Sequence, residues 1–137
     1  MKPRFVLDAW AILALLQREE PAASRVKQLM GEAERGAIEL FVSFINLGEV
    51  YYCIGRARGD HEARSTLDAI RRLSLTVVPV TEESVLAAAS FKMRYPISYA
   101  DAFAVAASEE LGATLVTGDP ELKQLEGRIR LEKLERR

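Results

Sequence analysis

Short apolar runs alternate with longer amphipathic stretches along this chain. The apolar runs predict strands at residues 2–7, 39–42, 75–80 and 114–117, with a weaker one at 129–131. Apolar side chains spaced three and four apart predict helices at residues 9–17, 22–34, 45–58, 61–73, 82–94 and 99–111. Buried strands that alternate with helices form parallel βαβ units with right-handed crossovers. The pattern therefore predicts an α/β fold, a three-layer α/β/α sandwich around a parallel sheet.

Length and composition are those of one ordinary domain. The chain has 137 residues, 49% of them hydrophobic and 28% charged, so we expect a single domain over residues 1–137. Its one cysteine, Cys53, cannot form an internal disulfide, which suits a reducing cytoplasm. The first residues do not have the form of a secretory signal, and the longest apolar stretch, residues 9–16, is too short to span a membrane. We therefore expect a cytoplasmic protein with no membrane segment.

The charge balance permits a nucleic-acid substrate without requiring one. The net charge is −1, which argues against binding of nucleic acid through bulk positive charge. If four acids are committed to a metal ion, however, the remaining surface is mildly positive. Most of the bases are arginine, which makes bidentate contacts with phosphate.

Four acidic residues differ from the rest because apolar residues surround them. They are Asp8, Glu49, Asp101 and Asp119. Taken singly, each is well explained as a helix cap or as an acid in the first turn of a helix. In particular, Glu49 stands three residues after Asn46, and Asp101 three after Ser98, which is the spacing of a capping box.

The predicted topology brings these four acids together. Asp8 and Asp119 each follow an apolar strand, and the carboxyl edge of a parallel sheet is where α/β proteins bind ligands. Helices that follow such strands begin at the same edge, so first-turn positions at Glu49 and Asp101 face the same crevice. Four carboxylates cannot all ionise there without a cation. Because no histidine or cysteine joins them, the oxygen-only set predicts Mg²⁺ or Mn²⁺, ions that activate water and polarise phosphoryl oxygens.

Other chemistries lack the residues they need. The single histidine, His61, lies in a charged turn, and with Cys53 it makes no zinc site. There is no nucleophile elbow, phosphate-binding glycine loop or dinucleotide motif. An aspartyl-phosphate enzyme of the haloacid-dehalogenase type needs a second aspartate where Trp10 stands.

Four segments at these separations resemble a known family. They are residues 6–16, 42–50, 97–106 and 113–119. Together they resemble the PIN domain and are most similar to the VapC-type toxins of bacterial and archaeal toxin–antitoxin pairs. The resemblance covers Phe5 to Leu122, nearly the whole chain.

The resemblance implies a five-stranded parallel sheet and an Mg²⁺- or Mn²⁺-dependent endoribonuclease that cleaves single-stranded or loop RNA. It implies that Asp8 and Asp101 are the principal metal ligands and that Glu49 is a ligand or orients water. Asp119 is then the fourth acid, acting through water, and Thr117 a supporting hydroxyl. One departure is that Ala9 stands where the family often has serine or threonine, which leaves the number of metal ions open.

Basic and aromatic residues near the acids are candidates for binding the RNA substrate. Lys92 and Arg94 precede the helix that carries Asp101, and Tyr99 in that helix offers a face for base stacking. An equally good reading is that Lys92 and Arg94 only close the helix over residues 82–94 with favourable charge.

The resemblance also implies protein partners. We expect a small cognate antitoxin and a homodimer. The helix over residues 45–58 carries three apolar residues close together, Tyr51, Tyr52 and Ile54. They point in different directions around the helix and cannot all face one core, so part of this surface is a candidate partner site. Two alternatives stay open: a non-catalytic PIN-like scaffold that binds RNA or protein, and a housekeeping RNA-processing nuclease.

Overall fold

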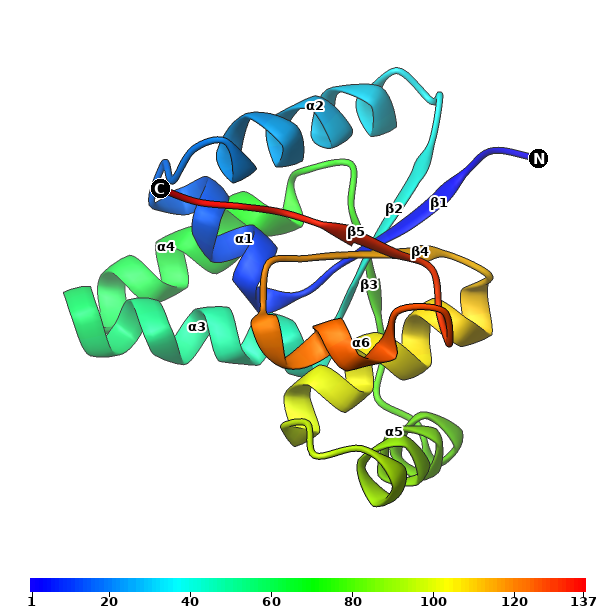
Figure 1. Ribbon diagram of the computed structural model, residues 1–137. Helices are drawn as coiled ribbons and strands as arrows, with labels where there is room; N and C mark the ends of the chain where they lie inside the picture. The colour runs from blue at the N-terminus through cyan, green and yellow to red at the C-terminus, as the bar shows by residue number, and fades with distance from the viewer.

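The computed structural model describes residues Met1–Arg137, whose five strands form a single parallel sheet (Figure 1). The strands are β1 (Arg4–Leu7), β2 (Glu39–Ser43), β3 (Thr76–Val78), β4 (Thr114–Thr117) and β5 (Leu131–Lys133). Their order across the sheet is β3-β2-β1-β4-β5, and all neighbours are parallel. The chain moves outward from β1 in one direction through β2 and β3 and in the other through β4 and β5. The carboxyl ends of β1 and β4 therefore flank the point where ligands bind in open α/β sheets.

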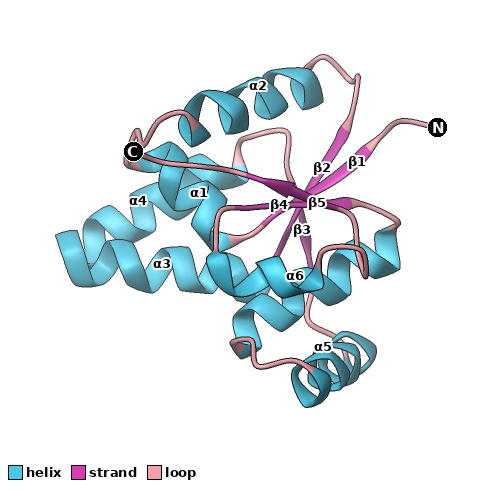
Figure 2. Ribbon diagram, in the orientation of Figure 1, coloured by secondary structure: helices cyan, strands magenta, loops and turns pink.

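Six α-helices and one 3₁₀ helix cover the two faces of the sheet (Figure 2). They are α1 (Ala9–Leu16), α2 (Ala22–Glu34), α3 (Phe44–Arg58), α4 (Asp60–Arg71), α5 (Glu82–Arg94), α6 (Tyr99–Leu111) and the 3₁₀ helix η1 (Pro120–Leu125). None of these helices has the length and hydrophobicity of a membrane-spanning segment.

Two hydrophobic cores, one on each face, confirm the predicted three layers. Successive strand residues point to opposite faces, so Leu7 packs with α1 to α4 while Val6 packs with α5, α6 and η1. Val116 and Leu115 on β4 divide in the same way. The strands are apolar on both faces because both faces are covered.

Several element boundaries differ from the sequence prediction by one or two residues, and the start of α3 is the one that bears on the site. Helix α3 begins at Phe44 because Ser43 is its N-cap, with Ser43 Oγ accepting hydrogen bonds from Ile45 N (3.1 Å) and Asn46 N (3.4 Å). Asn46 is therefore not a cap, and the predicted capping box with Glu49 is wrong. His61 lies in the first turn of α4, which begins at Asp60, one residue before its predicted start.

The last strand is also displaced from its predicted position. β5 covers Leu131–Lys133, where Leu131 pairs with Leu115, whereas the prediction was residues 129–131. Ile129 instead packs against the core under α5 and α6. The apolar pair Ile129 and Leu131 fits a strand in either register, and only the pairing with β4 selects one.

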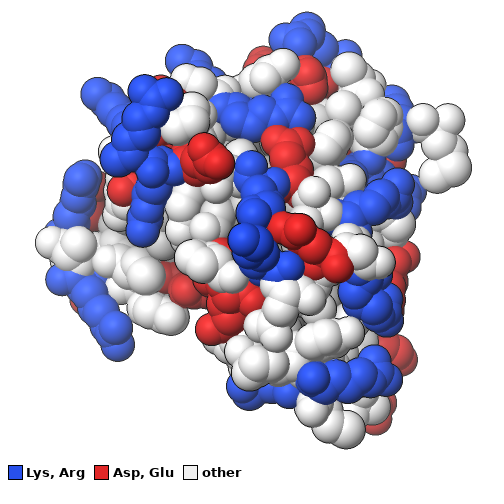
Figure 3. All heavy atoms as spheres, in the orientation of Figure 1, with Lys and Arg blue, Asp and Glu red and all other residues white.

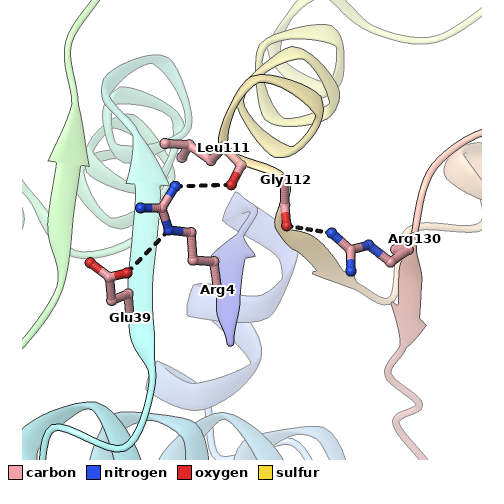
Figure 4. A network of polar contacts seen from close by, with 5 residues as sticks. All are labelled: Arg4, Glu39, Leu111, Gly112 and Arg130. Atoms are coloured by element: carbon pink, nitrogen blue, oxygen red, sulfur yellow. Dashed lines mark hydrogen bonds and ion pairs between the residues drawn. The ribbon is translucent and has the colours of Figure 1, made fainter. Parts of the chain in front are cut away.

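Two arginines hold the carboxyl end of α6 at the amino edge of the sheet (Figure 4). Arg4 Nη1 donates to the Leu111 carbonyl (3.1 Å), and Arg130 donates to the Gly112 carbonyl. Arg4 also pairs with Glu39 at 3.1 Å. Cations are favourable at a helix carboxyl end, where unpaired carbonyls carry partial negative charge. Since this end of α6 is fixed at the amino edge, its first turn, with Asp101, lies toward the carboxyl edge.

Candidate active site

Asp8 is a buried carboxylate at the carboxyl end of the central strand. It directly follows β1 and is 1% exposed. Its Oδ1 accepts a hydrogen bond from Ala11 N (2.9 Å), so Asp8 is the N-cap of α1. Its Oδ2 accepts a hydrogen bond from Thr117 Oγ1 on the neighbouring strand. Capping therefore uses one oxygen of Asp8 and leaves the other directed toward the end of β4.

The Thr117 hydroxyl connects Asp8 with Asp119. While it donates to Asp8, it accepts a hydrogen bond from Asp119 N at 3.0 Å. Asp119 in turn caps η1, with Oδ1 accepting from Glu121 N at 2.9 Å. Parallel pairing of β1 with β4 places these residues at the same sheet edge. One buried hydroxyl thus fixes the relative position of two acid-bearing segments.

Asp101 does not make the contact that a capping box requires. Ser98 Oγ accepts from Asp101 N (3.1 Å), as in a capping box, but the reciprocal bond is absent. The Ser98 backbone N–H donates instead to Glu121 Oε1. Because Glu121 satisfies that N–H, the Asp101 carboxyl does not bond the Ser98 backbone, and its pKa responds instead to Asp119, Asp8 and Glu121. The residue is only 7% exposed.

Glu49 reaches the site from the second turn of α3, one turn later than predicted, because Ser43 caps this helix. Asn46, one turn before Glu49, is fully buried and donates from Nδ2 to the Ala100 carbonyl at 3.1 Å. This bond joins α3 to the first turn of α6, next to Asp101. The other amide atom, Asn46 Oδ1, is buried without a hydrogen-bond partner. A buried acceptor of this kind calls for a donor such as an ordered water.

The acids share one electrostatic environment. Burial raises the pKa of Asp8 from 3.8 to about 7, against the hydrogen bond from Thr117, and the charges of Asp119 and Glu49 add to the rise. Burial, a hydrogen bond with Asp119 and the charges of Asp119 and Asp8 raise the pKa of Asp101 to about 8. Burial and the Asp119 charge also raise the pKa of Glu49. Without a cation, protons relieve the repulsion in this cluster.

The donor set fits a hard divalent cation that keeps part of its water shell. No three acidic, histidine or cysteine side chains converge closely enough to surround one ion. Mg²⁺, however, is commonly held by one or two carboxylates with waters in its other positions. Asp119 acts on the pKa of Asp101, which indicates that these two carboxyls are neighbours. The unpaired Asn46 Oδ1 offers an acceptor for a water.

The three predicted substrate-binding residues lie at the end of α5 and the start of α6. Lys92 Nζ donates to the Ile97 carbonyl (2.8 Å) and so joins the end of α5 to the loop that leads to α6. Arg94 is exposed and belongs to none of the ion pairs of the protein. Tyr99 is 43% exposed, with its ring centroid 5.1 Å from that of Phe103. Arg94 and Tyr99 are therefore both accessible, and Tyr99 shares the first turn of α6 with Asp101.

Sequence reasoning missed Glu121 and the true position of Asn46. Glu121 stands two residues after Asp119, among exposed charges, and only its contact with Ser98 reveals its place. Asn46 could have been noticed as a polar residue among apolar ones, between Ile45 and Leu47.

Fold and site together define a three-layer α/β/α protein with a carboxylate cluster at the switch point of a parallel sheet. Residues 5–128 match the model of the PIN domain, and the chain belongs to this family. A comparison with curated protein sequences gave no match.

Several solved structures share the fold. VapBC2 from Rickettsia felis, bound to a DNA fragment from its promoter, is 16% identical with a TM-score of 0.72, over 96% of this chain and 99% of that one. VapC20 from Mycobacterium tuberculosis, a toxin that cleaves the sarcin–ricin loop, is 19% identical with a TM-score of 0.70, over 91% and 95%. VapBC-1 from nontypeable Haemophilus influenzae is 20% identical with a TM-score of 0.70, over 95% and 97%.

Proposed function

We propose that the protein is an Mg²⁺- or Mn²⁺-dependent endoribonuclease that cleaves single-stranded or loop RNA. The observation that carries the proposal is that the Asp101 carboxyl does not cap its helix. A capping carboxylate would bond the Ser98 N–H, but Glu121 holds that N–H and Asp101 faces Asp119 instead. Membership of the PIN family and the fold shared with an RNA-cleaving toxin support the same activity.

Each acid then has a distinct role. Asp8 and Asp101 are the residues that would hold the cation, and Asp119 would act on it through water. Glu49, partly exposed at the rim, orients the water that attacks the phosphodiester. Thr117 keeps the carboxylate of Asp8 in place. The bound cation would supply charge stabilisation at the phosphoryl group and lower the pKa of water.

The RNA backbone is held outside this acidic cluster. Arg94 has no partner within the protein and supplies a phosphate contact, and Tyr99 offers a ring for a nucleobase. Lys92 keeps two further protons for phosphate while it bonds Ile97. On the face seen in Figure 3, basic and acidic side chains are interspersed, and basic ones gather near the carboxyl terminus of the chain.

We further propose that the protein is the toxin of a toxin–antitoxin pair, acting in the cytoplasm as a homodimer with a small antitoxin. Similar folds were solved as toxin–antitoxin complexes, which supports this. Of the apolar residues expected to form a partner surface on α3, Ile54 is buried and Tyr51 packs against the core. Tyr52 is 50% exposed, with Arg56 over its ring. A partner at α3 would therefore use Tyr52.

One observation favours the alternative of a non-catalytic scaffold, namely that no three acids converge on a point. Incubation of the protein with total RNA decides between them. Cleavage that needs Mg²⁺ or Mn²⁺, stops with EDTA and is lost in Asp101→Asn supports the nuclease. RNA binding without cleavage under all these conditions would establish the scaffold. A housekeeping nuclease would cleave in the same way but would be purified from its host without an antitoxin.

A further inference from the structure

Trp10 and Gly118 fit together where two acid-bearing segments meet. Trp10 is in the first turn of α1, two residues after Asp8, and Gly118 lies between Thr117 and Asp119. A β-carbon on Gly118 would overlap the outer indole edge of Trp10, at atoms Cζ2, Cη2 and Cζ3. Gly118 is not among the glycines with positive φ, so space and not backbone conformation requires glycine here. The indole occupies the volume that any side chain at position 118 would need.

The segment from Thr117 to Asp119 is already held on its other sides. The Thr117 carbonyl accepts a hydrogen bond from Leu134 N at 2.8 Å. The Thr117 hydroxyl holds both Asp8 and the Asp119 N–H. The indole edge closes the side at Gly118, which no hydrogen bond covers.

The Trp10 ring is itself fixed by the carboxyl-terminal segment. The Arg136 guanidinium carbon lies 5.0 Å from the ring centroid, and Arg136 pairs with Glu19 at 3.1 Å. Backbone bonds from Ala22 N to the Glu135 carbonyl (3.0 Å) and from Arg137 N to that of residue 20 (3.1 Å) fasten this segment. A cation over an indole face is favourable. The ring therefore has a protein contact both at its outer edge and over its face.

We propose that Trp10 is a positioning residue, which sets the Asp119 carboxylate relative to Asp8 and Asp101 through its contact with Gly118. This inference rests on the proposed cation site. If Trp10 moves or Gly118 gains a side chain, the Asp119 segment shifts while the Asp8 cap on α1 remains. Asp119 would then be out of place to bind a water on the cation that Asp8 and Asp101 would hold. Substitution of a residue that orients a metal ligand commonly lowers the affinity for the metal ion severalfold or more.

Gly118→Ala tests the contact directly, and Gly48→Ala is its matched control. Gly48 precedes Glu49 in α3, and a β-carbon there meets nothing within 4 Å. Calorimetric titration of Mn²⁺ should give about tenfold or greater loss of affinity in Gly118→Ala. Gly48→Ala should stay within about threefold of the wild type, since alanine is favourable in a helix. Equal affinity in Gly118→Ala and the wild type would overturn the proposal.

Trp10→Phe separates the role of the contact from a general loss of packing. Phenylalanine keeps an aromatic ring in α1 but lacks the outer edge that meets Gly118. The variant should bind Mn²⁺ more weakly than the wild type, and adding Gly118→Ala to it should cost almost nothing further. If Gly118→Ala costs as much in the Trp10→Phe background as in the wild type, it does not act through Trp10. If Gly118→Ala alone folds too poorly to titrate, wild-type affinity in Trp10→Phe would overturn the proposal.

Fluorescence provides a readout independent of activity. Trp10 is the single tryptophan of the chain, so its emission reports the Trp10–Gly118 contact. Emission should change as Mg²⁺ binds and should require correspondingly more Mg²⁺ in Gly118→Ala. A wild type that binds Mg²⁺ with no change in emission would overturn the positioning role and leave the nuclease intact. A wild type that binds neither Mg²⁺ nor Mn²⁺ would overturn the proposed function together with this inference.

Discussion

A divalent cation should stabilise this protein, and the gain should grow with pH. Burial and neighbouring charge raise the pKa of Asp8 to about 7 and that of Asp101 to about 8, from an ordinary 3.8. In the absence of cation, the native protein holds protons that the unfolded chain has already released. The contribution of these two protonated carboxyls to the free energy of unfolding is therefore fully present below about pH 4. It is lost as the pH rises through about 7 and 8.

The size of the effect follows from these pKa values. Each extra proton on the native state makes stability fall by up to about 1.4 kcal/mol per pH unit. A cation must displace these protons, so its apparent affinity should rise by about tenfold per pH unit for each one displaced. At a concentration one hundred times Kd, Mn²⁺ should contribute about 2.7 kcal/mol. For a domain of this size that corresponds to a rise in Tm of roughly 10 °C.

Thermal melts with EDTA and with Mn²⁺, from about pH 6 to about pH 8, measure both effects. The difference in Tm should be small at the acidic end and largest at the alkaline end. Asp101→Asn should remove most of it, whereas Glu62→Gln, which changes an exposed acid on α4, should leave it unaltered. Coincident melts at the alkaline end, or an equal shift at both ends, would contradict the linkage between the cation and the buried acids.

Four further experiments address the site residues and the partner. Asp101→Asn should abolish RNA cleavage while circular dichroism and Tm in EDTA stay at or above the wild-type values; cleavage at the wild-type rate would mean that Asp101 only caps α6. Thr117→Val should lower the free energy of unfolding by about 1–3 kcal/mol and weaken Mn²⁺ binding, because the buried Asp8 loses its hydroxyl donor; chemical denaturation and calorimetry measure the two changes, and an unchanged Mn²⁺ affinity would count against the proposed role. Arg94→Ala, in the Asp101→Asn background, should lower the salt slope of single-stranded RNA binding by about 0.7, while Arg58→Ala, at the far end of α3 from Glu49, should not; equal slopes for Arg94→Ala and its parent would place the RNA elsewhere. Purification from the native host should recover a small protein partner, and recovery of the chain alone would weaken the toxin assignment.

Local pattern was sufficient to predict most of the secondary structure and the places of two acids. The apolar spacing predicted every α-helix, because each helix buries one face and its apolar residues recur with the helical period. Asp8 and Asp119 could be placed at one sheet edge since both follow a strand and parallel strands end together. The family resemblance, carried by four segments of sequence, is confirmed by the match to the PIN domain over residues 5–128.

Other features depend on contacts between residues far apart in the chain. The sequence allows Ser98 to form a capping box with Asp101. Only the approach of η1 brings Glu121 to the Ser98 backbone N–H, which donates to it in place of Asp101. The local pattern predicted Asn46 as the cap of α3, whereas β2 ends at Ser43 and Ser43 caps the helix. The sequence shows Trp10 and Gly118 without any sign that they meet. Strand register and packing decide such contacts, because a local pattern specifies which face of an element is buried but not which residue lies against it.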